Sequence, residues 1–176
     1  MSATSTLERP APAAARPPDP VQRAIARTAE VLTAHSIDWL RISLGLVILG
    51  FGALKYFPGA SPAEDLVMRT TDVLTLGIVS GTAATVGTAV LETFIGLTLL
   101  TGIGLRFGLV AMAGWLVGIM TPVVLFTGDM FPGGLPTLEA QYVLKDVILA
   151  AAAAVVAARV LGARYVIAEP EAARSR

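Results

Sequence analysis

Apolar residues dominate the chain from residue 37 onward, in four runs separated by short polar or Gly/Pro-containing stretches. Each run is close to the ~20 residues that a helix needs to cross a bilayer. No stretch alternates apolar and polar residues as a half-buried strand would. We therefore predict a bundle of four transmembrane helices with these approximate bounds: 37–57, 82–102, 105–127 and 139–162.

The chain before the first apolar run has a different pattern. Residues 1–20 are rich in Pro, Ala and Ser and contain no apolar signal-peptide core, so we expect a disordered cytoplasmic tail. Residues 21–36 follow a helix-start pattern and place apolar residues on one helical face, at Val21, Ile25, Ala29 and Leu32. This pattern predicts a short amphipathic helix in the membrane interface. We expect residues 163–176 to form a second cytoplasmic tail.

Composition identifies lipid as the main solvent of this chain. Of its 176 residues, 55% are apolar and only 15% are charged, with a mean hydropathy of +0.72. A soluble domain carries about 25% charged residues. The formal net charge is zero, which argues against a nucleic-acid partner. We conclude that the fold class is an all-α integral membrane protein.

The same composition limits the chemistry that the chain can perform alone. It has no cysteine and a single histidine, His35, which excludes thiolate, iron–sulfur and multi-histidine metal sites. We expect no metal site and no covalently bound cofactor.

Basic residues predict the orientation of the four helices. Arginines precede the first run, separate the second from the third and follow the fourth, whereas the other two connections are mainly acidic. We therefore predict a multi-pass protein of the cytoplasmic membrane, with both termini in the cytoplasm.

Charged residues inside the apolar runs are the candidate functional residues. Glu92 lies ten residues into the second run, about 15 Å deep at ~1.5 Å per residue. An acidic residue there should face the bundle interior and have a partner. Lys55 closes the first run, and Lys145 and Asp146 lie near the start of the fourth, so all four could reach one region. Gln141 and Tyr142 would extend this polar lining outward.

Two interpretations of this cluster remain open. Its charges sum to zero, so two ion pairs could fix the helix register while nothing binds. Alternatively the cluster could form a proton-active or ligand-binding pocket for a quinone headgroup or a small anion.

Small residues at helical spacing predict where the helices pack. Gly45 and Gly52 share a face of the first run with Lys55, and Gly96 shares a face with Glu92. The third run contains a small-xxx-small pair, Gly114 and Gly118. Such residues allow membrane helices to approach closely.

Three stretches together resemble the DoxX-like family of small bacterial four-helix membrane proteins: LRISLGLVILGFGALKYFP, LETFIGLTLLTGIGLR and QYVLKDVILAAA. The resemblance covers roughly residues 37–162. The matching positions are Arg41, Gly45, Gly52, Lys55, Glu92, Gly96, Gly102, Arg106 and Lys145.

The resemblance implies a function in the bacterial cytoplasmic membrane. DoxX-like proteins include a subunit of a thiosulfate:quinone oxidoreductase and membrane components associated with redox proteins. We therefore expect a subunit that anchors or serves a quinone-linked oxidoreductase, is not catalytic alone, and has protein partners. Two alternatives remain: a structural subunit of a larger complex or homo-oligomer, and a small-solute or proton pathway.

Overall fold

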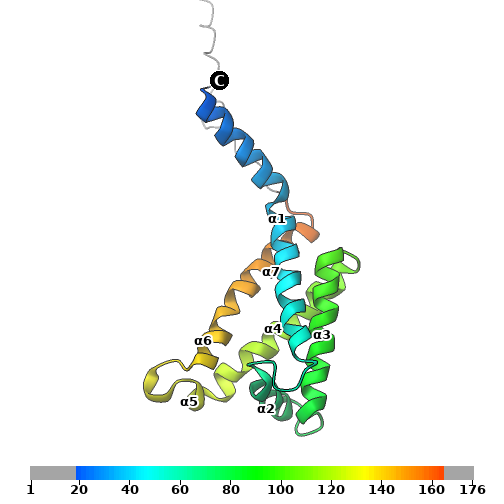
Figure 1. Ribbon diagram of the computed structural model, residues 1–176, viewed down its shortest axis with the longest axis vertical. Coiled ribbons are helices and arrows are strands. Elements are labelled where there is room, and N and C mark those ends of the chain that lie inside the picture. Colours follow the sequence, from blue (N-terminus) through cyan, green and yellow to red (C-terminus); the bar gives the residue numbers. More distant parts are fainter. Residues whose placement is uncertain (1–18, 165–176) are drawn as a thin grey trace, which may run out of the picture. The chain divides into compact units, whose positions relative to one another are not determined.

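The computed structural model describes residues 19–164, and every regular element in that range is a helix (Figure 1). The predicted tails lie almost wholly outside this range. In chain order the helices are α1 (Pro20–Leu54), α2 (Glu64–Leu74), α3 (Gly81–Thr101), α4 (Leu105–Leu125), α5 (Thr127–Met130), the 3-10 helix η1 (Pro132–Gly134), α6 (Leu138–Lys145) and α7 (Val147–Val160).

Helix α1 joins two segments that the sequence analysis separated at Ser36. The chain divides into two units after Ala34, yet the helix continues through this boundary. No glycine or proline lies between Pro20 and Gly45, so nothing in the backbone ends the first segment. In the part of α1 before the boundary, the side chains of Val21 and Ile25 are 63% and 64% exposed.

Three helices in the described range are long and apolar enough to cross a membrane: α1, α3 and α4. Within α1, residues 35–54 would cover about 30 Å at ~1.5 Å per residue, which matches a hydrocarbon core. Large apolar side chains are widely exposed on these helices, including Val90 at 55%, Val110 at 74% and Val117 at 70%. Surfaces of this kind belong in lipid, and they indicate a multi-pass membrane protein.

The fourth predicted span is divided in the structure. Residues 138–160 form α6 and α7, which meet at Asp146 and follow one another along the chain (Figure 1). Asp146 keeps a right-handed helical conformation, with φ −69° and ψ −10°. Its amide donates to the carbonyl of Val143, three residues back, so the helix tightens locally instead of reversing direction.

Glycines position α3 against both of its long neighbours. Its connection to α4 is a tight turn in which Gly102 and Gly104 have left-handed φ values of 75° and 66°. Just beyond this turn, Gly108 lies directly against the side chain of Thr98. A buried core joins the helices at this level: Ile37, Leu44, Ile48, Ile95, Leu99, Met112, Leu116 and Val156.

The opposite end of the bundle is closed by shorter elements. A second apolar cluster is built around Met130, Ala140 and Val143, with α2 and α4 contributing side chains to it. Arg69 of α2 bonds Asp129 at 2.8 Å and stacks 4.2 Å from the ring centre of Phe126. The Gly/Pro-containing connection between α4 and α6 therefore includes two short helices, α5 and η1.

Candidate functional site: a buried ion pair between two spanning helices

Lys55 and Glu92 form a two-pronged ion pair inside the bundle. The Lys55 Nζ atom lies 2.9 Å from Glu92 Oε1 and 2.8 Å from Oε2. Their side chains are only 5% and 2% exposed. Two of the charged residues singled out by the sequence thus meet across α1 and α3.

The backbone geometry around Gly52 brings the two charges together. A Cβ atom placed on Gly52 would lie 2.9 Å from the Cβ of Glu92, so any side chain there would push α3 away. Helix α1 ends at Leu54, and the next amides bond carbonyls three residues back, from Lys55 to Gly52 and from Tyr56 to Ala53. Lys55 therefore reaches Glu92 from the tightened turn that ends α1.

A third helix contributes a further partner for Glu92. The indole Nε1 of Trp115, on α4, donates to Glu92 Oε1 at 3.0 Å. A buried indole N–H needs an acceptor. This requirement is the feature of the sequence that could have indicated a polar partner for Trp115. Trp115 ties α4 to the α1–α3 pair through one carboxylate.

The residues predicted on the fourth run do not all join this centre. Asp146 is half-buried and within electrostatic range of both Lys55 and Glu92. Lys145 is exposed, with its ammonium 4.0 Å from the ring centre of Tyr142. Gln141 is also exposed and its amide donates to the carbonyl of Pro136 at 3.4 Å. The structure therefore does not bring Lys145, Gln141 and Tyr142 to the ion pair, because all three side chains are exposed on α6.

The charge balance of the centre explains how it is tolerated in an apolar bundle. Lys55 and Glu92 neutralise each other, and both carboxylate oxygens accept a hydrogen bond, which offsets the desolvation of the two ions. One polar group nearby is left over. The hydroxyl of Thr85, two turns before Glu92 on α3 and 3% exposed, has no hydrogen-bond partner among the described residues.

A second polar contact lies at the other end of the α1–α3 pair. The Arg41 guanidinium donates to the carbonyl oxygens of Leu99 and Leu100, in the last turn of α3. Its Nε atom lies 3.7 Å from Asp38, three residues earlier on α1. A cation at these carbonyls is favoured because the C-terminal end of a helix carries partial negative charge.

The glycines predicted to pack fall into two groups. Gly45 and Gly96 lie at the closest approach of α1 and α3, where a Cβ on Gly96 would be 2.8 Å from the Cβ of Leu49. By contrast, a Cβ on Gly114 or Gly118 would meet nothing within 4 Å, so neither marks a close contact inside the described chain. Gly108 makes the tight α3–α4 contact instead, and its G-x-x-x-G spacing with Gly104 was the signal for it.

The arrangement determines which ligands the centre could hold. Within residues 19–164, no group of three or more His, Asp or Glu side chains could hold a metal ion. The centre instead presents two N–H donors, from Lys55 and Trp115, directed at one carboxylate. Such a centre could exchange the carboxylate for another hydrogen-bond acceptor, or pass a proton between Lys55 and Glu92.

No family model matches the chain, and no curated protein or solved structure matches it. The DoxX-like assignment therefore stays a prediction from the sequence.

Proposed function

We propose that the chain is a four-span subunit of the bacterial cytoplasmic membrane that anchors or serves a quinone-linked oxidoreductase or redox complex. The observation that carries this proposal is the buried Lys55–Glu92–Trp115 centre. A quinone headgroup has carbonyl oxygens that accept hydrogen bonds. If the Glu92 carboxylate turned aside, the N–H donors of Lys55 and Trp115 would both become available to such an oxygen.

A fourth span is supported by the geometry of α6 and α7. Residues 138–160 would cover about 34 Å at ~1.5 Å per residue, enough to cross the hydrocarbon core. The half-buried Asp146 falls at their junction, within electrostatic range of the ion pair. Such a span would bring the carboxylate of Asp146 into the bundle as a second acidic group.

The orientation proposed for the helices follows from their charged ends. We define the basic end by Arg41, Arg106, Arg159 and Arg164. At the opposite end lie α2 and α5, with Glu64, Asp65 and Asp129. Basic ends of membrane proteins face the cytoplasm, which would place both termini there.

A second candidate function is structural. Both oxygens of Glu92 already accept hydrogen bonds, and Gly52 lies tightly against its Cβ. A saturated ion pair of this kind can lock three helices without any ligand, as a scaffold for a complex or a homo-oligomer requires.

Tryptophan fluorescence can test the quinone proposal on the purified chain. The protein has two tryptophans, so Trp39→Phe leaves Trp115 as the sole reporter beside Glu92. We expect ubiquinone-1 to quench its emission saturably in detergent, and Lys55→Met, which removes one of the two donors, to abolish the saturable component. Lys145→Gln is the matched control, because Lys145 is exposed.

The same variants distinguish the two functions in the assembled complex. Gentle extraction from the native membrane should recover a redox partner, whose quinone-dependent turnover is lost in Lys55→Met while assembly persists. Normal turnover together with unsaturable quenching would rule out the pocket. Loss of assembly with unchanged quenching would favour the scaffold.

A further inference from the structure

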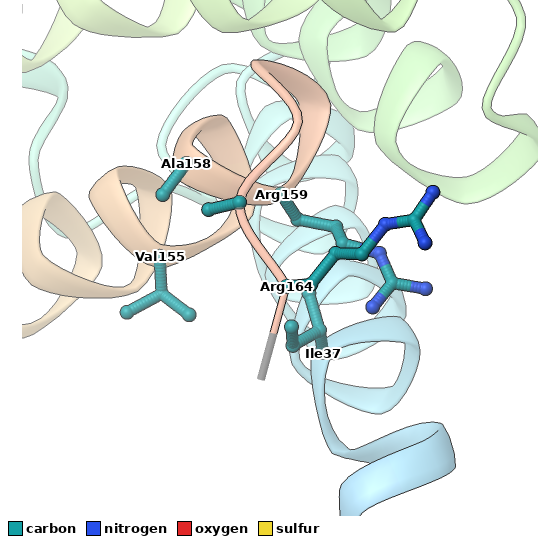
Figure 2. Close-up of a pocket in the computed structure, with 6 residues that line it drawn as sticks. Ile37, Val155, Ala158, Arg159 and Arg164 are labelled. Atoms are coloured by element: carbon teal, nitrogen blue, oxygen red, sulfur yellow. The ribbon is translucent and has the colours of Figure 1, made fainter. Parts of the chain in front are cut away.

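A cleft lined by two arginines lies where the end of α7 meets α1 (Figure 2). Its volume is about 180 Å³, below the ~300–1,000 Å³ of typical small-molecule sites. It therefore fits one group of a larger ligand. The lining residues are Ile37, Val155, Ala158, Arg159, Ala163 and Arg164.

The turn after α7 explains why both arginines reach this cleft. Gly162 has a left-handed φ of 104°, and the amide of Ala163 donates to the carbonyl of Ala158 at 2.9 Å. This is the bond pattern of a Schellman cap, which satisfies the last carbonyls of a helix. The chain folds back over the end of α7, and Figure 2 shows the guanidinium groups of Arg159 and Arg164 on the same side of the cleft.

No acidic group among residues 19–164 pairs with either guanidinium group. Within residues 19–164, neither Arg159 nor Arg164 forms an ion pair or a hydrogen bond through its side chain. The nearest acidic residue along α1, Asp38, is already paired with Arg41. Two unpaired guanidinium groups on one side of a cleft create a positive potential that a phosphate group can satisfy through paired N–H donors.

We propose that this cleft binds the phosphate headgroup of an anionic phospholipid. The phosphate lies between Arg159 and Arg164, and the start of an acyl chain lies along the apolar wall formed by Ile37, Val155 and Ala158. Charge complementarity selects an anion, and the apolar wall selects one with an attached hydrocarbon chain. Basic pockets between spanning helices recognise anionic headgroups in this way. The site is independent of the quinone proposal, since it shares no residue with it.

The test is a lipid titration of the purified full-length chain in detergent, read by native mass spectrometry. We expect dioleoylphosphatidylglycerol to bind more tightly than dioleoylphosphatidylcholine. Arg159→Gln and Arg164→Gln should each weaken phosphatidylglycerol binding about fivefold, and the double variant about 25-fold. Arg106→Gln removes an exposed arginine of the same basic end and should change binding less than twofold.

A fourth variant separates a lipid from free phosphate or from general surface charge. Ala158→Phe fills the cleft but keeps both arginines, and it should weaken phosphatidylglycerol binding at least as much as either arginine variant. Inorganic phosphate in large excess should displace little lipid from the wild type. Three results would overturn the proposal: equal affinity for the two lipids, equal losses in Arg106→Gln and Arg159→Gln, or an unaffected Ala158→Phe whose lipid is displaced by phosphate.

Discussion

The chain contains two lysines, and the structure places them in opposite environments. Lys55 is 6% exposed and bonds a carboxylate on another helix. Lys145 is exposed and lies over the ring of Tyr142, a residue of its own helix. Both lie in or beside apolar runs with an acidic residue within reach. The difference shows that a charge in an apolar segment is buried only where an adjacent helix can approach it.

Glycine accounts for much of this difference. On α1, Gly52 lies one turn before Lys55 and allows the Cβ of Glu92 to come close. The segment around Lys145, residues 138–149, contains no glycine. A close contact at a glycine therefore accompanies the buried lysine, whereas no glycine lies near the exposed one.

The largest expected effect comes from leaving Lys55 buried without its counter-ion. Glu92→Leu removes the carboxylate and should lower the free energy of unfolding by about 3–5 kcal/mol, the cost of an uncompensated buried charge. The measurement is reversible unfolding in mixed micelles. A loss below ~1 kcal/mol would show that Lys55 reaches water without Glu92, and the contrast with Lys145 would then fail.

A double variant sharpens the same comparison. Because Lys55→Met with Glu92→Leu removes both charges, we expect it to be more stable than Glu92→Leu alone by about 1–3 kcal/mol. Lys145→Met combined with Glu92→Leu should add no such recovery. The unfolding free energies of the four proteins in each cycle decide the outcome.

The indole contact of Glu92 should contribute less than its ionic partner does. Trp115→Phe keeps an aromatic ring but removes the N–H donor to Oε1. We expect a loss of about 1.5–3 kcal/mol, typical of a hydrogen bond to a charged group. Trp39→Phe is the matched control, because Trp39 is 51% exposed. Equal losses in the two variants would mean that ring size, and not the hydrogen bond, is measured.

Glycine substitutions test the role of close approach directly. Gly96→Ala would place a Cβ 2.8 Å from Leu49 and 3.1 Å from the Gly45 carbonyl, so we expect a loss of about 1–3 kcal/mol from overpacking. Gly114→Ala meets nothing within 4 Å and should be neutral, or stabilising by up to ~1 kcal/mol through helix propensity. Thermal midpoints in one detergent would separate the two.

The smallest effect is expected at the exposed lysine. Lys145→Ala removes the ammonium from the Tyr142 ring, a contact worth about 0.5–1 kcal/mol at an exposed site. Unfolding measurements should place it within ~1 kcal/mol of the wild type. A loss approaching that of Glu92→Leu would mean that Lys145 is buried in the assembled protein.

Hydrophobic patterning was enough to predict the all-helical membrane fold. The bounds of α3 and α4 lie within two residues of the predicted runs 82–102 and 105–127. The helices differ from the predicted segments at Ser36 and at Asp146. No glycine or proline lies beside Ser36, and α1 continues through it. Asp146 is flanked by helix-compatible residues, yet a single 3-10 bond divides α6 from α7.

The candidate site could be predicted only in part. Spacing places a residue on a helical face, but it does not give the rotation of that helix against its neighbours. The face of α1 that contains Gly45 and Gly52 lies against α3. The polar residues of α6, Gln141, Tyr142 and Lys145, are exposed instead. Partners on a third helix, such as Trp115, depend on the same rotation. Carbonyl acceptors such as those that meet Arg41 carry no sequence signal, since every residue has one.

The order of the ion pair along the chain has a consequence for how the protein is made. Lys55 leaves the ribosome 37 residues before Glu92, so the first helix enters the membrane machinery with an ammonium that has no counter-ion. Arg41 likewise precedes its carbonyl partners on α3 by 58 and 59 residues. We therefore expect stable insertion of the first helix to depend on arrival of the second.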